Sequence, residues 1–312
     1  MLIIYTFNAF DPDVISTKVT WWTGGWNKSD LEKVVRADKL RWPHREECLI
    51  TLIRFLLRDK CIICLQEVND EFLRQLKLIF SNKISWTKSR DKITYINRTT
   101  KEKKIIEKEQ YRVTLVSKEL KIINFRDILF NTNETEKAGL ITFVKYNEYI
   151  IPIINVHFHW KSTMDDITGY ANVINDLNFD KYIICGDMNK PLSSPYIKAF
   201  INKCNINPVE TSVRITGPET RDDSEHDEST VIPYEVEFPN VKLSSVDHIL
   251  TYGDIKINNI GARRDVMIMF PDVKSLINLG KSEKQIADEW IERRNCKDLS
   301  DHALVYGEII FK

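Results

Sequence analysis

Polar side chains follow several of the apolar, strand-like runs in this sequence. Asn8 comes after the first of these runs, Glu67 comes after the second, and His157 closes a third. The pattern continues toward the C-terminus with Asp187, Asn189, Asp247, Asp301 and His302. Strands end at the edge of a sheet, so side chains that follow different strands can meet there. Carboxylate and amide oxygens can bind hard divalent cations, and carboxylates and imidazoles can transfer protons. The sequence therefore predicts one polar site that is assembled from distant segments of the chain.

Each of these residues has a plainer explanation when it is taken alone. Asn8, Asp187 and Asn189 are of the types that cap helices and turns, and His157 could be a hydrogen-bonded histidine of the core. The functional interpretation depends on the order and the spacing of the whole set.

In order and spacing, the set resembles the motifs of the endonuclease/exonuclease/phosphatase superfamily, whose members have the DNase I-like fold. The motifs are an Asn after the first strand, Leu-Gln-Glu, a strand ending in His, Gly-Asp-x-Asn, an inner Asp and a terminal Ser-Asp-His. All six occur here in sequence, from Asn8 to His302. The resemblance spans practically the whole chain. It implies an α/β (α+β) protein of four layers, αββα, in which helices flank a two-sheet β-sandwich, as one domain of residues 1–312.

A finer resemblance points to one branch of that superfamily. The segment Leu40 to Arg45 has a Trp and an Arg ahead of Leu-Gln-Glu-Val, and the segment Asn155 to Trp160 reads Asn-Val-His-Phe-His-Trp. Both features are similar to the branch that contains deadenylases, nocturnin and 2′,5′-phosphodiesterases. The resemblance implies that the substrate is an RNA 3′ end or a 2′,5′-linked oligonucleotide, with His159 and Trp160 as substrate contacts.

The superfamily resemblance also implies a hydrolase that cleaves phosphodiesters with a divalent cation, Mg²⁺ or alternatively Mn²⁺. Such hydrolysis needs charge neutralisation on the non-bridging oxygens, a deprotonated water in line, and help for the leaving oxygen. The implied metal ligands are Glu67, Asn8 and Asp301. Among the implied catalytic residues, Asp187 would orient or deprotonate the attacking water, and Asn189 would donate to the developing phosphorane oxygen. His157 and His302 would bind the phosphate. Asp247 would hold His302 in one tautomer.

Three other interpretations stay open at the level of sequence. The chain could process DNA, as an abasic-site endonuclease or a tyrosyl-DNA phosphodiesterase does. It could act on a lipid head group, as a sphingomyelinase or an inositol-phosphate phosphoesterase does, although we find no amphipathic basic helix to bring it to a membrane. It could be a binding module without catalysis, but loss of catalysis would free the motif positions to change, and none of the six is changed.

Strands and helices must position these residues, and the chain shows patterns for both. Short β-branched and aromatic runs predict strands at Leu2 to Phe7, Cys61 to Leu65, Arg112 to Val116, Leu140 to Val144, Tyr149 to Val156, Tyr182 to Cys185, Val246 to Thr251 and Ala303 to Phe311. Helices are expected at Arg45 to Leu57, Asp70 to Phe80, Asp165 to Leu177, Pro195 to Asn205 and Ser282 to Arg294.

Composition limits the class of protein. The chain has 312 residues, of which 43% are hydrophobic and 29% charged, and this balance excludes a disordered or fibrous protein. Its 45 Lys and Arg residues balance 45 Asp and Glu residues, so no overall charge attracts it to nucleic acid or to an anionic membrane. A polyanionic substrate must then be held by local groups or by a metal.

The cysteines and the N-terminus give an expectation about the compartment. Six cysteines are too few for a disulfide framework, and Cys61, Cys64 and Cys185 lie in apolar runs that predict buried strands. The segment Met1 to Phe10 lacks the basic start and the cleavage site of a signal peptide, and no apolar run approaches the ~20 residues of a membrane span. We expect a reduced intracellular protein, cytoplasmic or nuclear, whose partner is a nucleic acid or nucleotide substrate and not a membrane.

Overall fold

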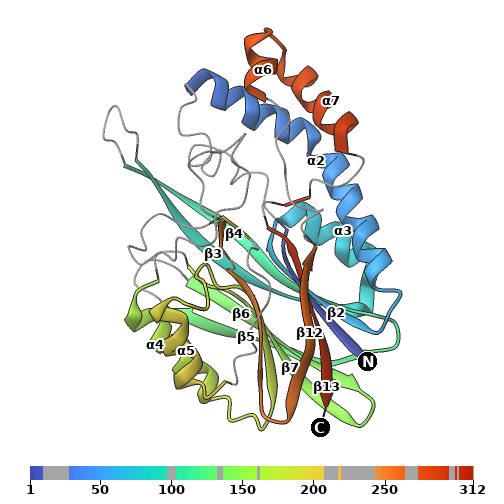
Figure 1. Ribbon diagram of the computed structural model, residues 1–312, viewed down its shortest axis with the longest axis vertical. Coiled ribbons are helices and arrows are strands. Elements are labelled where there is room, and N and C mark those ends of the chain that lie inside the picture. Colours follow the sequence, from blue (N-terminus) through green and yellow to red (C-terminus); the bar gives the residue numbers. More distant parts are fainter. Residues whose placement is uncertain are drawn as a thin grey trace.

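The computed structural model describes residues 1–9, 28–96, 103–131, 136–159, 162–206, 217–218, 243–244, 246–263, 273–294, 299–300 and 302–311. Within these ranges, most strands belong to two layers that face each other, and helices cover the outer faces (Figure 1). The expected two-sheet sandwich with flanking helices is confirmed.

The first layer has the strand order β12, β13, β1, β2, β4, β3. Its strands are β1 (Leu2–Asn8), β2 (Cys61–Val68), β3 (Ile84–Ile96), β4 (Lys103–Val116), β12 (Ile255–Arg263) and β13 (Leu304–Phe311). β1 and β2 run parallel, and the other neighbours pair antiparallel. The parallel pair brings the C-terminal ends of β1 and β2, and the polar residues there, to the same edge.

The second layer has the strand order β11, β8, β7, β6, and β5 pairs with β6. Its strands are β5 (Lys121–Asn131), β6 (Glu136–Tyr146), β7 (Tyr149–His157), β8 (Tyr182–Asp187) and β11 (Asp247–Tyr252). β7 and β8 run parallel, with His157 opposite Asp187, and β11 pairs antiparallel with β8, with Asp247 opposite Asp187. These registers alone place three polar residues side by side. One residue pair, Arg90 with Glu136, joins β3 to β6, and β9 (Gly217–Pro218) pairs with β10 (Leu243–Ser244) apart from the sandwich.

Helices cover both outer faces of the sandwich (Figure 1). The helices are α2 (Lys28–Leu56), α3 (Asp70–Phe80) with the short η1 (Ser81–Lys83), α4 (Met164–Asn175), α5 (Pro195–Lys203), α6 (Val273–Asn278) and α7 (Glu283–Arg294). α2 and α3 lie on the first layer, and α4 and α5 lie on the second. α7 packs on the N-terminal part of α2, where Arg41 lies over the ring of Trp290.

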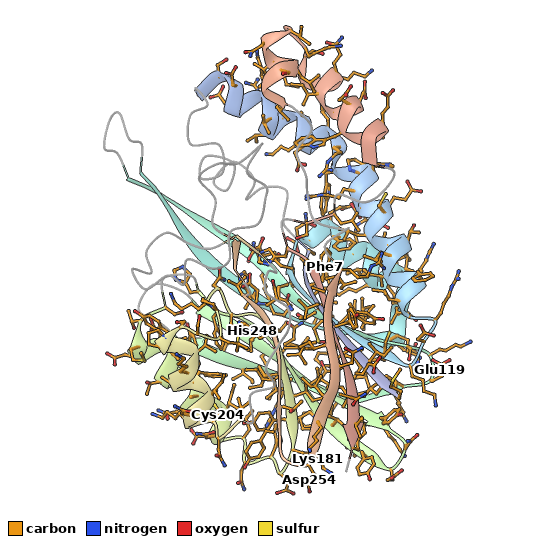
Figure 2. The ribbon with its side chains drawn as sticks, in the orientation of Figure 1. Phe7, Glu119, Lys181, Cys204, His248 and Asp254 are labelled. Carbon is orange, nitrogen blue, oxygen red and sulfur yellow. The ribbon has the colours of Figure 1, made fainter. Side chains whose placement is uncertain are left out.

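Apolar clusters fill the space between these layers. The cluster between the two sheets contains Ile4, Ile62 and Ile183, all fully buried. A second cluster joins the first sheet to α2 and α3, and a third joins the second sheet to α4 and α5. Figure 2 shows Lys181 and Asp254 at one end of the sandwich, and His248 and Phe7 lie farther toward the other end.

The cysteines differ from the expectation at one position. Cys61, Cys64 and Cys185 are free and buried, as the apolar runs predict. Cys48 is disulfide-bonded, so the expectation of a fully reduced chain is wrong at this cysteine. Among the described residues, no helix has both the length and the apolar character to span a membrane.

Candidate active site

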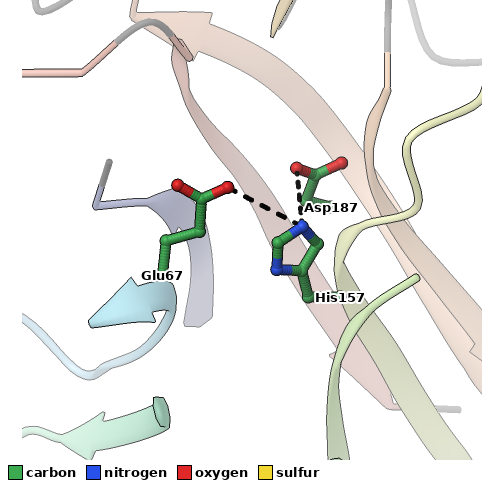
Figure 3. A group of neighbouring side chains, drawn as sticks. All are labelled: Glu67, His157 and Asp187. Atoms are coloured by element: carbon green, nitrogen blue, oxygen red, sulfur yellow. Dashed lines mark ion pairs between the residues drawn. The ribbon is translucent and has the colours of Figure 1, made fainter. Parts of the chain in front are cut away.

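The two sheets each contribute one half of a buried polar cluster. Asn8 and Glu67 lie at the C-terminal ends of the adjacent strands β1 and β2 of the first sheet, and His302 precedes β13 of the same sheet. His157, Asp187 and Asp247 come from adjacent strands of the second sheet. Figure 3 shows Glu67 facing His157 and Asp187 across the gap between the sheets. The cluster therefore exists only when the sandwich is assembled.

Asp187 lies at the centre of the cluster. Asn8 Nδ2 donates a hydrogen bond to Asp187 Oδ2 over 3.0 Å. The same oxygen lies 3.5 Å from His157 Nε2 and 3.7 Å from His302 Nε2. The Asp187 side chain is almost fully buried. One carboxylate oxygen of Asp187 is thus surrounded by side chains from both sheets.

The local backbone around Asp187 fixes the direction of its side chain. Gly186 has a φ of 145°, and a Cβ at this position would lie 1.9 Å from the Val156 carbonyl oxygen of the neighbouring strand. Only glycine fits so close an approach. Asn189 has a φ of 55°, and its backbone N–H donates to Asp187 Oδ1 over 2.8 Å. Its side-chain Nδ2 donates to the Phe158 carbonyl oxygen over 2.8 Å.

Glu67 projects from a β-bulge. The pairing of β2 with β4 shifts between Leu65 and Val68, so Gln66 and Glu67 together face the single residue Arg112. Glu67 has a φ of 52°, in the left-handed region that glutamate rarely adopts. Bulges re-aim a side chain, and strained backbone of this kind collects at functional sites. The Glu67 Oε1 atom lies 3.8 Å from His157 Nε2.

His302 is held from two directions. Its Nδ1 lies 2.7 Å from Asp247 Oδ2, a short hydrogen bond between two buried side chains. Its backbone N–H donates to Ser300 Oγ over 3.1 Å, and the Ser300 hydroxyl donates to the Asn8 carbonyl oxygen over 2.5 Å. Because Nδ1–H of His302 donates to the Asp247 carboxylate, Nε2 is the nitrogen that faces Asp187.

Burial raises the pKa of Asp187 from its ordinary value of 3.8 to about 6. The carboxylates of Asp247 and Glu67 add to this rise in pKa, whereas His302 and the Asn189 backbone N–H oppose it. A carboxylate with a pKa near neutrality is suited to accept a proton from water.

The donor atoms also fit a hard divalent cation. One ligand atom each from Glu67, His157 and Asp187 lie within 4.8 Å of one another, and so do one each from Asp187, Asp247 and His302. Carboxylate oxygens predominate in both groups, which suits Mg²⁺ or Mn²⁺ better than a soft metal. The described residues can therefore hold a cation at this edge of the sandwich.

Solved structures of other proteins share this architecture. An endonuclease/exonuclease/phosphatase family protein from Bacteroides thetaiotaomicron is similar, with a TM-score of 0.60 and 13% sequence identity over 100% of this chain and 98% of that one. This chain has the endonuclease/exonuclease/phosphatase fold. A TDP2 from D. rerio, solved with a single-strand DNA product, gives 0.53 at 14% identity over 99% of this chain and 98% of that one. The human nocturnin catalytic domain, with a bound sulfate anion, gives 0.51 at 13% identity over 100% and 93%. No family model and no curated protein matches the chain.

The endonuclease/exonuclease/phosphatase fold brings six of the expected site residues into one cluster. They are Asn8, Glu67, His157, Asp187, Asp247 and His302. Asn189 lies beside them through its backbone bond to Asp187. His159 is half-buried beyond the end of β7, where its carbonyl oxygen accepts from the Ser162 backbone N–H. Asp301 and Trp160 lie outside the described residues.

Sequence reasoning missed four polar residues that support the cluster. They are Gln66, Arg112, Asn155 and Ser300. All four are almost fully buried. The signal was present in the sequence for Asn155, because it lies two residues before His157 and alternate residues of a strand share one face.

Proposed function

We propose that this chain is a divalent-metal-dependent phosphodiesterase that acts on RNA 3′ ends or on 2′,5′-linked oligonucleotides. The observation that carries the proposal is the environment of Asp187. Its Oδ2 atom lies within 3.7 Å of Asn8, His157 and His302, which come from both sheets. A buried carboxylate that contacts two histidines is costly to the fold, and such groups are typical of catalytic sites.

Glu67 and Asn8 are the described residues that would hold the cation, with His157 and Asp187 within reach of it. Asp301 is proposed as a further ligand. A bound Mg²⁺ or Mn²⁺ would neutralise charge on the non-bridging phosphate oxygens.

The side chains of the cluster have separate tasks in the proposed reaction. Asp187 accepts a proton from the attacking water, and the Asn8 amide holds the carboxylate in place. Asp247 accepts a hydrogen bond from Nδ1–H of His302, and in the doubly protonated imidazolium Nε2–H would donate to the phosphate. His157, whose Nε2 lies 3.5 Å from Asp187 Oδ2, also binds the phosphate. Asn189 stabilises the phosphorane oxygen through the amide hydrogen that Phe158 does not use.

A DNA substrate is the second candidate. The D. rerio TDP2 that was solved with a single-strand DNA product matches this fold as well as human nocturnin does, with TM-scores of 0.53 and 0.51. In favour of the RNA or 2′,5′-linked substrate is the Asn155 to Trp160 segment, whose sequence resembles the deadenylase and nocturnin branch. His159 and Trp160 are the proposed substrate contacts of that segment.

A substrate panel separates the candidates. End-labelled oligo(A) RNA, 2′,5′-oligoadenylate, single- and double-stranded DNA, tyrosyl-DNA and sphingomyelin are incubated with the protein in Mg²⁺, and the products are resolved. We expect cleavage of the first or second substrate and none in excess EDTA. The Glu67→Ala variant is expected to lose turnover by several orders of magnitude and to keep its thermal stability. Full activity in EDTA, or in Glu67→Ala, would contradict the proposed mechanism.

A further inference from the structure

The candidate site is divided between two sheets, so its geometry depends on how the sheets are held apart at this edge. Glu67 belongs to the first sheet and His157 to the second, and 3.8 Å separates Glu67 Oε1 from His157 Nε2. Apolar packing sets the distance between two sheets only loosely, because it is non-directional. Directional bonds between the sheets are needed to fix a separation of this kind.

Asn155 makes such bonds with every polar atom of its side chain. It is fully buried on β7, two residues before His157. Its Nδ2 donates to the carbonyl oxygens of Leu65, over 3.1 Å, and Val113, over 3.0 Å. Its Oδ1 accepts from Gln66 Nε2 over 2.7 Å. All three partners belong to the first sheet. The side-chain amide of Asn155, which is on the second sheet, therefore makes all of these hydrogen bonds across to the first sheet.

These partners surround the bulge that carries Glu67. Leu65 and Val113 are the last residue pair of the β2–β4 ladder before the bulge, and Gln66 is the first bulged residue. Arg112, which faces the bulge, donates from Nη2 to the His157 carbonyl oxygen at 3.5 Å. The bulge and the end of β7 are therefore tied together on both sides.

We propose that Asn155, together with Gln66, is a positioning residue that holds the bulge against β7 and thereby fixes Glu67 relative to His157. A left-handed backbone at a glutamate persists only where its surroundings impose it, and the bonds of Asn155 supply that constraint. Asn155 does not touch the reacting groups. It acts through Glu67, in the way that residues behind a metal ligand orient it.

The test compares Asn155→Leu with a matched control, Thr142→Val. Thr142 also makes a buried hydrogen bond between the sheets, in which its Oγ1 and Ser85 Oγ lie 2.6 Å apart, but Ser85 is not part of the bulge. For both variants, Mn²⁺ affinity is measured by isothermal titration calorimetry without substrate. Amide hydrogen exchange of residues 61–68 is measured without metal, and unfolding by denaturant gives stability.

We expect both variants to lose stability, while Asn155→Leu alone weakens Mn²⁺ binding, by about 10- to 100-fold, and speeds exchange at residues 61–68. If Asn155→Leu does not fold, Gln66→Met decides. It removes the bond to Asn155 and keeps the bonds of Asn155 to Leu65 and Val113, and the other bonds that it removes, to Thr6 and the Cys64 carbonyl oxygen, lie within the first sheet. Wild-type Mn²⁺ affinity and wild-type exchange in the folded variant, or equal effects in Thr142→Val, would overturn the proposal. The Mn²⁺ readout rests on the proposed function. If the wild-type protein binds no Mn²⁺, the metal-dependent function fails and the exchange data alone decide the positioning role.

Discussion

At the scale of single residues, the site contains buried ionisable groups whose polar neighbours do not fully offset the cost of burying charge. Asp187 is surrounded by Asn8, His157 and His302, yet burial and two nearby carboxylates raise its pKa to about 6. A surface carboxylate would be solvated at less cost to the fold. Burial of the Asp187 carboxylate lowers the stability of the fold, but the raised pKa favours proton transfer, and buried groups of this kind are therefore typical of active sites.

The raised pKa of Asp187 predicts how stability depends on pH in the metal-free protein. The folded-state pKa of about 6 exceeds the ordinary value of 3.8, so the stability contributed by protonated Asp187 is present below about pH 4 and is lost as pH rises through 6. The uncharged variant Asp187→Asn lacks this loss. We expect its free energy of unfolding, relative to wild type, to rise between pH 4.5 and pH 7.5, measured by chemical denaturation in EDTA. A difference that does not change with pH would contradict the raised pKa.

Asp247 and His302 are predicted to act as one unit. The 2.7 Å bond between Asp247 Oδ2 and His302 Nδ1 orients the imidazole, so either partner is of little use without the other. In a double-mutant cycle on turnover, Asp247→Asn with His302→Ala should lose little more than His302→Ala alone. Thermal melts of each variant control for unfolding. Strictly additive losses in the logarithm of the rate would show that the two residues work independently.

At the scale of elements, sequence patterns identified those with strong local signals. α3 was predicted from Asp70 to Phe80, and the structure has these bounds, with Asn69 accepting from the Phe72 backbone N–H as its cap. Helix α2 runs from Lys28 to Leu56, whereas only the part from Arg45 was expected. Pro43 lies inside α2 and counts against a helix in sequence, and burial against neighbouring elements outweighs that propensity.

Strands with an exposed face were the ones missed. β3, β5 and β12 were not predicted, and only the last residues of β4 were. In β12, Lys256, Asn258 and Asn259 are exposed between buried isoleucines, so the run is not continuously apolar. Central strands such as β2 and β8 are buried throughout and were identified. The candidate site was largely predictable for the same reason, since most of its residues lie at the ends of buried strands. The bulge at Glu67 could not be predicted from the sequence, because it arises from the pairing of β2 with β4.

The close approach of β7 and β8 predicts different outcomes for two glycine substitutions. Gly186→Ala would place a Cβ 1.9 Å from the Val156 carbonyl oxygen at a φ of 145°, so it should destabilise the protein by at least about 2 kcal/mol. Gly169 lies inside α4 with nothing within 4 Å of an added Cβ, and Gly169→Ala should stabilise by about 0.5 to 1 kcal/mol. Chemical denaturation measures both. Equal effects of the two substitutions on the free energy of unfolding would contradict the close approach of β7 and β8 at Gly186.

At the scale of the whole molecule, a neutral protein is proposed to bind a polyanion. The 45 basic and 45 acidic residues give a formal net charge of zero, so no overall field draws nucleic acid to the surface. The edge that carries the candidate site is itself rich in carboxylates, including Glu67, Asp187 and Asp247. In the proposed function, attraction for a phosphate is therefore local, and a bound cation and the two histidines of the cluster would supply it.

This charge distribution predicts a weak dependence of catalytic efficiency on salt. Single-stranded substrates release counterions in proportion to the phosphates that a protein neutralises, with a slope of about −0.7 per phosphate in a plot of log affinity against log salt. Because the proposed phosphate contacts all lie at the candidate site, we expect a slope of about −1 to −2 for kcat/KM. The slope should be the same for a short and a long oligonucleotide of the same end sequence, measured at constant Mg²⁺. A slope that steepens with length would mean that an extended basic surface, and not the candidate site, holds the substrate. A flat profile with either substrate would instead mean that no phosphate is neutralised on binding, which the proposed roles of His157 and His302 do not allow.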